Sequence, residues 1–367
     1  MRVSPSRSGG GVAAVVTIAA AAVGLLGACG GGPAPLMPSP SASVTATTSP
    51  SGPATLGFSV GYRGLTLDDA ELARQLDLDV QVGARWVRVD LDWSTVERHR
   101  GSDDWDDVDR VVAAARQRGL EVLALPGYTP DWAADGQGGP DARAYAAFVG
   151  RAVARYAPQG VRTWELWNEP NLHSAWGSDP DPQAYGRLLR AAVPAALAAD
   201  PGATVLTGGL APVPDRDGSS VAMRTFLEGL AAAGPVPGLA GVALHPYVYP
   251  SLPRDAPVSP TNAFGMLDEL HDLARALAGP DATVWATEMG APTGDDARAV
   301  SPQEQAETLR QAHALLGERP WAGPLLIYAD RDVGADPGDR EENFGLLDLD
   351  FRPKPAWAVF AELAAGR

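Results

Sequence analysis

Two short segments of the sequence place a glutamate where a predicted strand ends. They are Trp164-Glu165-Leu166-Trp167-Asn168-Glu169-Pro170-Asn171 and Thr287-Glu288-Met289-Gly290. Proline cannot donate a hydrogen bond to a sheet, so the first strand has to end before Pro170 and leave Glu169 in a loop. A carboxylic acid can protonate a glycosidic oxygen, an amide can bind a ring hydroxyl, and indoles stack on sugar rings. The pattern favours sugar chemistry, although a capping Asn beside a solvated Glu at a turn would have the same sequence.

The apolar pattern of the chain indicates a fold that can position these segments. Short β-branched or apolar runs predict strands at Gly57–Gly61, Trp86–Asp90, Glu121–Pro126, Val161–Trp167, Ala203–Gly208, Gly241–His245, Thr283–Thr287 and Pro324–Tyr328. Helical periodicity predicts helices at Asp104–Arg118, Ala142–Tyr156, Gln183–Ala199, Ala222–Ala233, Thr261–Leu277, Pro302–Leu316 and Pro355–Ala365. Strands that alternate with helices in this way predict the α/β class and a single (β/α)8 TIM barrel. The alternative is an open doubly wound sheet, but Gly61-Tyr62-Arg63-Gly64 lacks a phosphate-binding glycine fingerprint.

Catalytic groups of such a barrel lie at the carboxyl ends of its strands. The predicted strands are followed or ended there by ionisable and aromatic residues: Arg88, Asp90, Asp92, Trp93, Tyr128, Asn168, Glu169, His245, Tyr247, Glu288, Tyr328 and Asp330. The fourth and seventh strands lie across the barrel mouth from each other. We therefore expect Glu169 and Glu288 to face one another.

This pair of carboxyl groups predicts a retaining glycosidase, with Glu169 as general acid/base and Glu288 as nucleophile. The retaining mechanism needs two carboxyl groups about 5–5.5 Å apart, one protonated and one ionised. We expect Arg88 to point at Glu288 and keep it ionised, and the charge of Glu288 to favour a proton on Glu169.

The residues around the pair have supporting roles in this prediction. We expect Tyr247 or His245 to hydrogen-bond Glu288, and Asn168 to bind the sugar hydroxyl beside the reacting carbon. The residue pattern leaves other interpretations open. Arg88 could form a structural ion pair with Asp90 or Asp92, His245 could be a strand-end histidine with satisfied hydrogen bonds, and Glu288 could cap a turn.

Aromatic and polar residues in the loops are the remaining candidates for substrate binding. Trp132 and Trp176 follow strand ends, so we expect their indoles to stack on sugar rings, while Trp86, Trp164, Trp285 and Trp357 pack the barrel or its helices. Tyr328 and Asp330 begin a charged loop that could bound a substrate groove or be solvated. The sequence has no His-Glu-x-x-His, cysteine pair or EF-hand spacing, so we expect no catalytic metal and no cofactor.

The segments around the two glutamates also resemble a known group of enzymes. Glu165-Leu166-Trp167-Asn168-Glu169-Pro170-Asn171, His245-Pro246-Tyr247 and Thr287-Glu288-Met289-Gly290 are similar to the acid/base, sixth-strand and nucleophile motifs of clan A glycoside hydrolases. Phe344-Gly345-Leu346-Leu347, followed by Lys354-Pro355-Ala356, resembles the tail of family 39 and family 5 members. Tyr328-Ala329-Asp330-Arg331-Asp332 is closer to family 39-like enzymes, because in family 5 a tryptophan usually ends the eighth strand. The resemblance covers nearly all of Leu56 to Arg367.

The first part of the chain predicts export. Arg2 and Arg7 precede an apolar run, and Leu26-Gly27-Ala28-Cys29 resembles the cleavage site of a bacterial lipoprotein signal, in which Cys29 would be lipidated. We therefore predict a signal peptide at residues 1–28, a disordered Pro/Ser/Thr-rich tether at 29–55 and a catalytic domain at 56–367. An ordinary secretory signal or an uncleaved anchor is the alternative. Cys29 is the only cysteine, so we expect no disulfides.

Composition and length limit the partners and the competing functions. The formal net charge of −16, without a basic cluster, argues against nucleic acid, and we expect a monomer that meets the membrane only through its lipid anchor. The predicted substrate is a β-linked polysaccharide or oligosaccharide. A non-catalytic glycan-binding lipoprotein on the same barrel is an alternative, and so is a solute-binding lipoprotein, which would need two α/β lobes.

Overall fold

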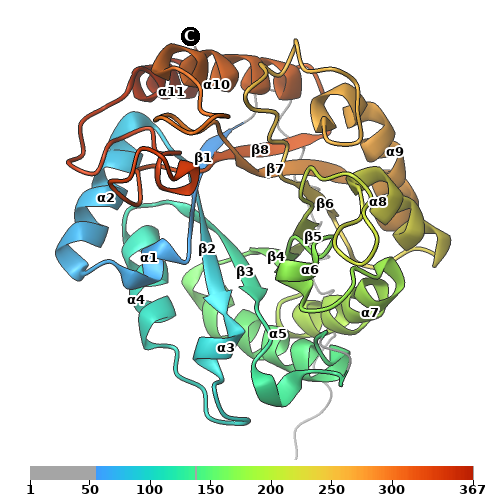
Figure 1. The fold of residues 1–367 in the computed structure, drawn as a ribbon. Coiled ribbons are helices and arrows are strands. Elements are labelled where there is room, and N and C mark those ends of the chain that lie inside the picture. The colour runs from blue at the N-terminus through green and yellow to red at the C-terminus, as the bar shows by residue number, and fades with distance from the viewer. Residues whose placement is uncertain (1–54, 137–138, 367) are drawn as a thin grey trace, which may run out of the picture. The chain divides into compact units, whose positions relative to one another are not determined.

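The computed structural model describes residues 55–136 and 139–366, which all belong to one unit of the chain, Ser49–Arg367. Eight parallel strands close into a barrel in chain order, and the last strand pairs with the first (Figure 1). They are β1 (Leu56–Gly61), β2 (Trp86–Asp92), β3 (Glu121–Gly127), β4 (Thr163–Asn168), β5 (Thr204–Gly209), β6 (Gly241–Leu244), β7 (Thr283–Met289) and β8 (Ala322–Ile327). The closed ring confirms the predicted TIM barrel and excludes both the open sheet and the two-lobed architecture.

Helices follow the strands and cover the outside of the barrel (Figure 1). Their ends carry the expected caps: Asp68 accepts a hydrogen bond from Glu71 N at 2.8 Å, and Ser301 forms a capping box with Glu304. The helices are α1 (Arg63–Thr66), α2 (Asp69–Val82), α3 (Trp93–Val96), α4 (Asp106–Gln117), α5 (Ala142–Tyr156), α6 (His173–Trp176), α7 (Pro182–Ala199), α8 (Met223–Ala232), α9 (Leu267–Ala278), α10 (Pro302–Gly317) and α11 (Pro355–Ala364). Short 3-10 turns occupy Asp131–Ala133, Ala157–Gln159, Ala263–Met266 and Arg340–Glu342.

Helix α2 is a regular part of the barrel that the apolar pattern did not predict. Its buried face contains Gln75 and Asp79 among leucine and valine, so polar residues interrupt the helical period of apolar ones. Gln75 donates a hydrogen bond to Asp79 at 3.2 Å. The predicted helix over Thr261–Leu277 also differs. There the Asn262 side chain accepts from Gly265 N, which closes a 3-10 turn before α9 begins.

Apolar packing divides between the outside and the inside of the barrel. The large cluster of buried side chains includes Trp164 and the residues between sheet and helices, and Trp357 packs against it. A separate small cluster consists of Leu123, Leu206, Trp285 and Leu326, with Trp86 against it at 5.2 Å from Trp285 between ring centroids. The four tryptophans predicted to pack the barrel and its helices therefore do so.

Predictions about the first part of the chain are not tested by this fold. The signal peptide, the lipidated Cys29 and the tether up to residue 54 lie outside the described residues. Among residues 55–136 and 139–366, no helix combines the length and the apolar character needed to cross a bilayer.

Candidate active site

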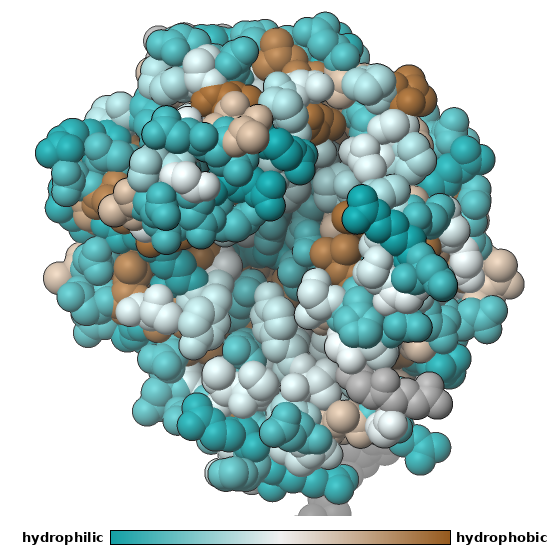
Figure 2. All heavy atoms as spheres, in the orientation of Figure 1, coloured by the Kyte–Doolittle hydropathy of each residue, from teal (hydrophilic) through white to brown (hydrophobic). Residues whose placement is uncertain are grey.

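A cleft of about 740 Å³ opens at the carboxyl ends of the strands. Figure 2 shows the hollow near the centre of the face toward the viewer, with hydrophilic residues (teal) along its walls. Glu169 and Glu288 both line this cleft, as the barrel topology predicted. Other residues that line it are Asp90, Tyr128, Asn168, Tyr247, Tyr249, Arg298, Tyr328, Arg340 and Phe344.

The backbone after β4 turns sharply and carries Glu169 into the cleft. Trp167 and Glu169 adopt φ angles of +85° and +44°, in the left-handed region that non-glycine residues rarely occupy. The surrounding structure holds this conformation. Glu169 N donates to Gly209 O at 3.0 Å, and the Asn171 amide binds the backbone of Ala211 on both its oxygen and its nitrogen side, each at 2.9 Å. Strained backbone that is this well supported is typical of functional sites.

Glu288 is surrounded by groups that favour its ionised form. Arg88 Nη1 lies 2.5 Å from Glu288 Oε1, and Tyr247 donates its hydroxyl hydrogen to Oε2 at 3.0 Å. Burial acts to raise the pKa of Glu288. The positive groups His245 and Arg88, together with the Tyr247 hydrogen bond, outweigh that effect and hold the pKa below its usual value.

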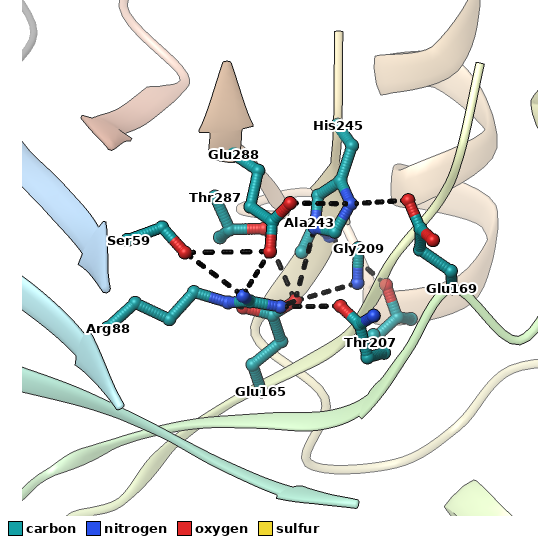
Figure 3. A network of polar contacts seen from close by, with 12 residues as sticks. Ser59, Arg88, Glu165, Glu169, Thr207, Gly209, Ala243, His245, Thr287 and Glu288 are labelled. Atoms are coloured by element: carbon teal, nitrogen blue, oxygen red, sulfur yellow. Dashed lines mark hydrogen bonds and ion pairs between the residues drawn. The ribbon is translucent and has the colours of Figure 1, made fainter. Parts of the chain in front are cut away.

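The orientation of Arg88 is fixed by a second carboxylate inside the barrel, Glu165. Arg88 binds Glu165 through two parallel hydrogen bonds, at 2.8 Å from Nε and 3.1 Å from Nη2 (Figure 3). Both side chains are buried, and Glu165 also accepts from Gly209 N at 2.8 Å and from the Thr287 hydroxyl at 3.2 Å. A buried ion pair needs such additional hydrogen bonds to offset the loss of hydration. Glu165 therefore positions Arg88 against Glu288.

His245 connects the two cleft glutamates (Figure 3). Its Nδ1 lies 3.0 Å from Glu169 Oε1 and 3.6 Å from Glu288 Oε2, so these two oxygens are no farther apart than the sum of those distances, 6.6 Å. Burial lowers the pKa of the His245 imidazole, but the negative charges of Glu288 and Glu169 raise it by a larger amount, so the pKa lies above its usual value. Gly209 leaves room for the ring, since a Cβ there would lie 2.1 Å from His245 Nε2.

Most of the residues predicted from strand ends meet in this cleft. Arg88 contacts Glu288 as predicted, with Asp90 more distant at 4.0 Å. Tyr247 is the group that hydrogen-bonds Glu288, whereas His245 hydrogen-bonds Glu169. Asn168 lines the cleft, and its Oδ1 accepts a hydrogen bond from Arg88 at 2.8 Å. Its amide N–H groups do not take part in that contact. Tyr328 also lines the cleft.

Three predicted contacts with substrate do not fit the structure. Within the described residues, Trp132 and Trp176 are not among those that line the cleft. The Trp132 indole donates to Glu97 O at 2.7 Å, and Trp176 is 3% exposed because it packs between Trp167 and Tyr185. Asp330 is buried behind the cleft wall, where its Oδ1 accepts from Arg331 N at 2.7 Å. The aromatic rings at the cleft are instead Tyr62, Tyr128, Tyr247, Tyr249, Tyr328 and Phe344.

The residue types alone did not reveal the part played by Glu165. The signal for Glu165 was present, because a charged residue in the middle of an apolar strand has to be paired when it is buried. Among the described residues, no group of three His, Cys, Asp or Glu side chains is arranged to hold a metal ion.

Comparisons with known proteins identify similar folds. No protein-family model matches the chain, and no curated protein matches it. A family 39 glycoside hydrolase from Bacteroides cellulosilyticus WH2 matches 86% of this chain with a TM-score of 0.66 and 24% identity. A GH39 enzyme from Xanthomonas axonopodis pv. citri matches 86% with a TM-score of 0.63 and 21% identity. A GH5_18 protein from Streptomyces cattleya, in complex with GlcNAc, matches 86% with a TM-score of 0.65 and 22% identity.

This chain spans 64%, 68% and 80% of the lengths of those three chains, respectively. Similarity at this level of identity shows a shared (β/α)8 fold. The neighbours are nevertheless glycoside hydrolases of families 39 and 5, the two families that the sequence resembles.

Proposed function

We propose that the protein is a retaining glycoside hydrolase that cleaves a β-linked oligosaccharide or polysaccharide. The observation that carries this proposal is the pair of glutamates that contact one histidine at the cleft, Glu169 at 3.0 Å and Glu288 at 3.6 Å. His245, Arg88 and Tyr247 hold the pKa of one member of the pair, Glu288, below its usual value despite burial, which supports an ionised nucleophile. A carboxylate nucleophile beside a carboxylic acid is the arrangement that double displacement needs.

In the first step, a Glu288 oxygen attacks the anomeric carbon while Glu169 gives its proton to the glycosidic oxygen. The bond from carbon to the leaving oxygen breaks, and a glycosyl ester forms on Glu288. In the second step, Glu169 takes a proton from a water molecule, whose oxygen attacks the anomeric carbon. The ester bond then breaks, Glu288 is again a carboxylate, and Glu169 is again an acid.

The contacts of both carboxyl groups with His245 Nδ1 set an upper limit on their separation, and this limit supports retention over inversion. Inverting enzymes separate the groups by about 6.5–9.5 Å to admit a water molecule, whereas retaining enzymes separate them by about 5–5.5 Å. The two oxygens that contact His245 Nδ1 lie at most 6.6 Å apart. This upper limit coincides with the lower edge of the inverting range, so almost all of that range is too long for this pair. The nucleophile is also the better buried of the two side chains, at 15% exposed against 22% for Glu169.

Two kinds of observation support the substrate class, the first for a glycan and the second for its β-linkage. The cleft is open and lined by tyrosines and polar groups, which suit a glycan. Among proteins of similar fold are an exo-β-1,4-mannosidase from an Opitutaceae bacterium and a GH5_18 variant in complex with Manβ1-4GlcNAc. A non-catalytic glycan-binding protein on the same barrel is the competing proposal, and it predicts binding without product.

The test is a product screen with a stereochemical readout. The protein is incubated with β-linked xylan, mannan, glucan and galactan, and proton NMR records which anomer of the new reducing end appears first. We expect the β-anomer from the wild-type protein and no product from Glu288→Ala. An α-anomer that appears first would contradict retention, and binding of glycans without any product would favour the competing proposal.

We also propose that the chain is exported and anchored to the membrane by a lipid on Cys29. The support is the sequence alone, in which Leu26-Gly27-Ala28-Cys29 follows a basic and then an apolar segment. Metabolic labelling with a radioactive fatty acid should mark the wild-type chain and leave Cys29→Ala unlabelled. Equal labelling of the two would contradict the proposal.

A further inference from the structure

Asp90, on β2, is a cleft residue to which the mechanism gives no role. It is 4% exposed and lines the cleft, and its Oδ2 accepts a hydrogen bond from the Tyr128 hydroxyl at 3.0 Å. Its other oxygen, Oδ1, has no hydrogen-bond partner in the described part of the chain and lies 4.0 Å from Arg88 Nη1. A buried oxygen without a donor is costly, so it marks a place where a ligand can supply one.

Arg88 cannot supply that donor, because its N–H groups are all engaged. The guanidinium has five N–H donors. Its Nε binds Glu165, its Nη1 binds Ser59 and Glu288, and its Nη2 binds Glu165 and Asn168. The two other arginines that line the cleft form hydrogen bonds elsewhere, since Arg298 binds Tyr249 O at 2.7 Å and Arg340 binds Glu341 at 3.0 Å.

The charges around Asp90 suit a neutral partner with a hydroxyl group. Burial raises the pKa of Asp90 to about 6, and Glu288 and Glu165 add to the effect while Arg88 and Tyr128 oppose it. Above that pH, Asp90 is a hydrogen-bond acceptor beside the ionised Glu288. The carboxylate of an acidic sugar would lie beside the negative charges of Asp90 and Glu288, and no N–H group of Arg88 is free to bind it.

We propose that Asp90 binds a hydroxyl group of the sugar that Glu288 attacks, and that this position takes a neutral sugar and rejects a uronic acid. The proposal rests on the proposed function, because it names the substrate class of the same site. Tyr128 acts as a positioning residue, since its hydroxyl holds Asp90 Oδ2 and leaves Oδ1 for the sugar. Specificity then depends on the sugar hydroxyl that donates to Asp90, because a deoxy analogue without that hydroxyl leaves the Asp90 oxygen unpaired.

The first test compares neutral and acidic sugars. The probes are 4-nitrophenyl β-glycosides of xylose, glucose, mannose, galactose and glucuronic acid, and the readout is kcat/KM. We expect at least one neutral glycoside to be turned over and the glucuronide to be the poorest substrate. A glucuronide that is the best substrate would overturn the inference. If the wild-type protein turns over none of the five and also releases no product from the β-linked polysaccharides, the proposed function fails and this inference fails with it.

The second test is a double-mutant cycle between Asp90 and the sugar hydroxyls. It uses the best glycoside and its monodeoxy analogues with the wild-type protein, Asp90→Ala and Asp90→Asn. A hydrogen bond to a charged group implies a loss of about 10- to 100-fold in kcat/KM for Asp90→Ala. With the wild-type protein, one monodeoxy analogue should have a kcat/KM lower than that of the parent glycoside by the same factor. With Asp90→Ala, that analogue and the parent glycoside should have the same kcat/KM. Losses that multiply for every analogue would overturn the inference.

Matched variants separate binding from folding. Asp92→Asn changes an aspartate two residues away, whose side chain caps α3 by accepting from Ser94 N at 2.9 Å. Asparagine caps helices as well as aspartate does, so this variant should discriminate among the analogues as the wild-type protein does. Tyr128→Phe should weaken discrimination at the same hydroxyl as Asp90→Ala. If it alters discrimination at a different hydroxyl, the assigned role of Asp90 is wrong. Turnover that Glu288→Ala abolishes and Asp90→Ala leaves unchanged would uphold the proposed function and reject this inference.

Discussion

Tyr247 donates its hydroxyl hydrogen to Glu288 Oε2 at 3.0 Å, and Arg88 contacts the other oxygen of the same carboxylate. Each oxygen of Glu288 therefore has a donor that favours the ionised form. Together with His245, these donors overcome the effect of burial and hold the pKa of Glu288 below its usual value.

Removal of the Tyr247 hydroxyl should weaken this arrangement. We expect Tyr247→Phe to lower kcat/KM by about 10- to 100-fold, because a hydrogen bond to a charged group is lost. The pKa of Glu288 should rise in this variant, so the acid side of the pH profile of kcat/KM should move to higher pH. An acid limb at the wild-type position would show that Tyr247 does not stabilise the Glu288 carboxylate.

Replacement of Glu169 should slow most the substrates whose leaving group needs a proton to depart. With Glu169→Ala we expect a loss of roughly 10²- to 10⁴-fold on an oligosaccharide, the range typical of general acid catalysis, and a much smaller loss in the first step on a dinitrophenyl glycoside. Steady-state and burst kinetics on the two substrates measure this difference. Equal losses on both would contradict the role of Glu169 as the acid.

Gly209→Ala should move His245 without changing either carboxylate. The new Cβ would lie 2.1 Å from His245 Nε2 and 2.9 Å from the Thr287 hydroxyl oxygen, so the imidazole has to shift away from residue 209, and its Nδ1 then leaves its present position against Glu169. Displacement of about 1 Å in an active site costs roughly 10²-fold in rate, and we expect that loss in kcat.

The matched control is Gly150→Ala in α5. There a Cβ would meet its nearest neighbour at 3.7 Å, an ordinary contact, so activity should be unchanged. Wild-type activity in Gly209→Ala would contradict the account of how His245 is held.

Asp79 should make the folded protein less stable as the pH rises. It is buried, and burial together with the charge of Asp330 raises the pKa of its carboxyl well above the usual value, although a hydrogen bond from Gln75 opposes this. An acid whose pKa is higher in the folded than in the unfolded state stabilises fully below the unfolded pKa, about 3.9 for Asp. That contribution is lost as the pH rises from there through the folded pKa.

We therefore expect Asp79→Asn to flatten the fall in the free energy of unfolding above about pH 4, because asparagine does not ionise. Denaturant unfolding at several pH values measures it. Asp77→Asn is the matched control, since Asp77 lies on the same helix with 67% of its side chain exposed and contacts Arg118 at 2.7 Å. A wild-type slope in Asp79→Asn would contradict the prediction.

The barrel and the position of the two glutamates could be predicted because both follow from local pattern and topology. Strands buried on both faces appear as continuous apolar runs, and parallel strands bring their carboxyl ends to one side. Thus β2, β4 and β7 began within two residues of the expected positions, Glu169 and Glu288 line the same cleft, and Arg88 contacts Glu288 from inside the barrel.

Features that depend on distant partners could not be predicted in this way. Glu165 is stabilised in the barrel by Arg88, 77 residues earlier. Helix α2 was missed for a local reason, because the buried Gln75 and Asp79 interrupt its apolar period. The loops after β3 and β4 turn Trp132 and Trp176 toward the protein and away from the cleft, which only their packing against Trp93 and Trp167 decides.

Covalent trapping of the glycosyl intermediate tests the central proposal most directly. The protein is treated with a 2,4-dinitrophenyl 2-deoxy-2-fluoro-β-glycoside of its best sugar, which forms the glycosyl ester quickly and releases it slowly, and is then digested for mass spectrometry. We predict one fluoroglycosyl group per chain, attached to Glu288. A label on any other residue, or steady turnover with no labelled protein, would contradict the double displacement through Glu288.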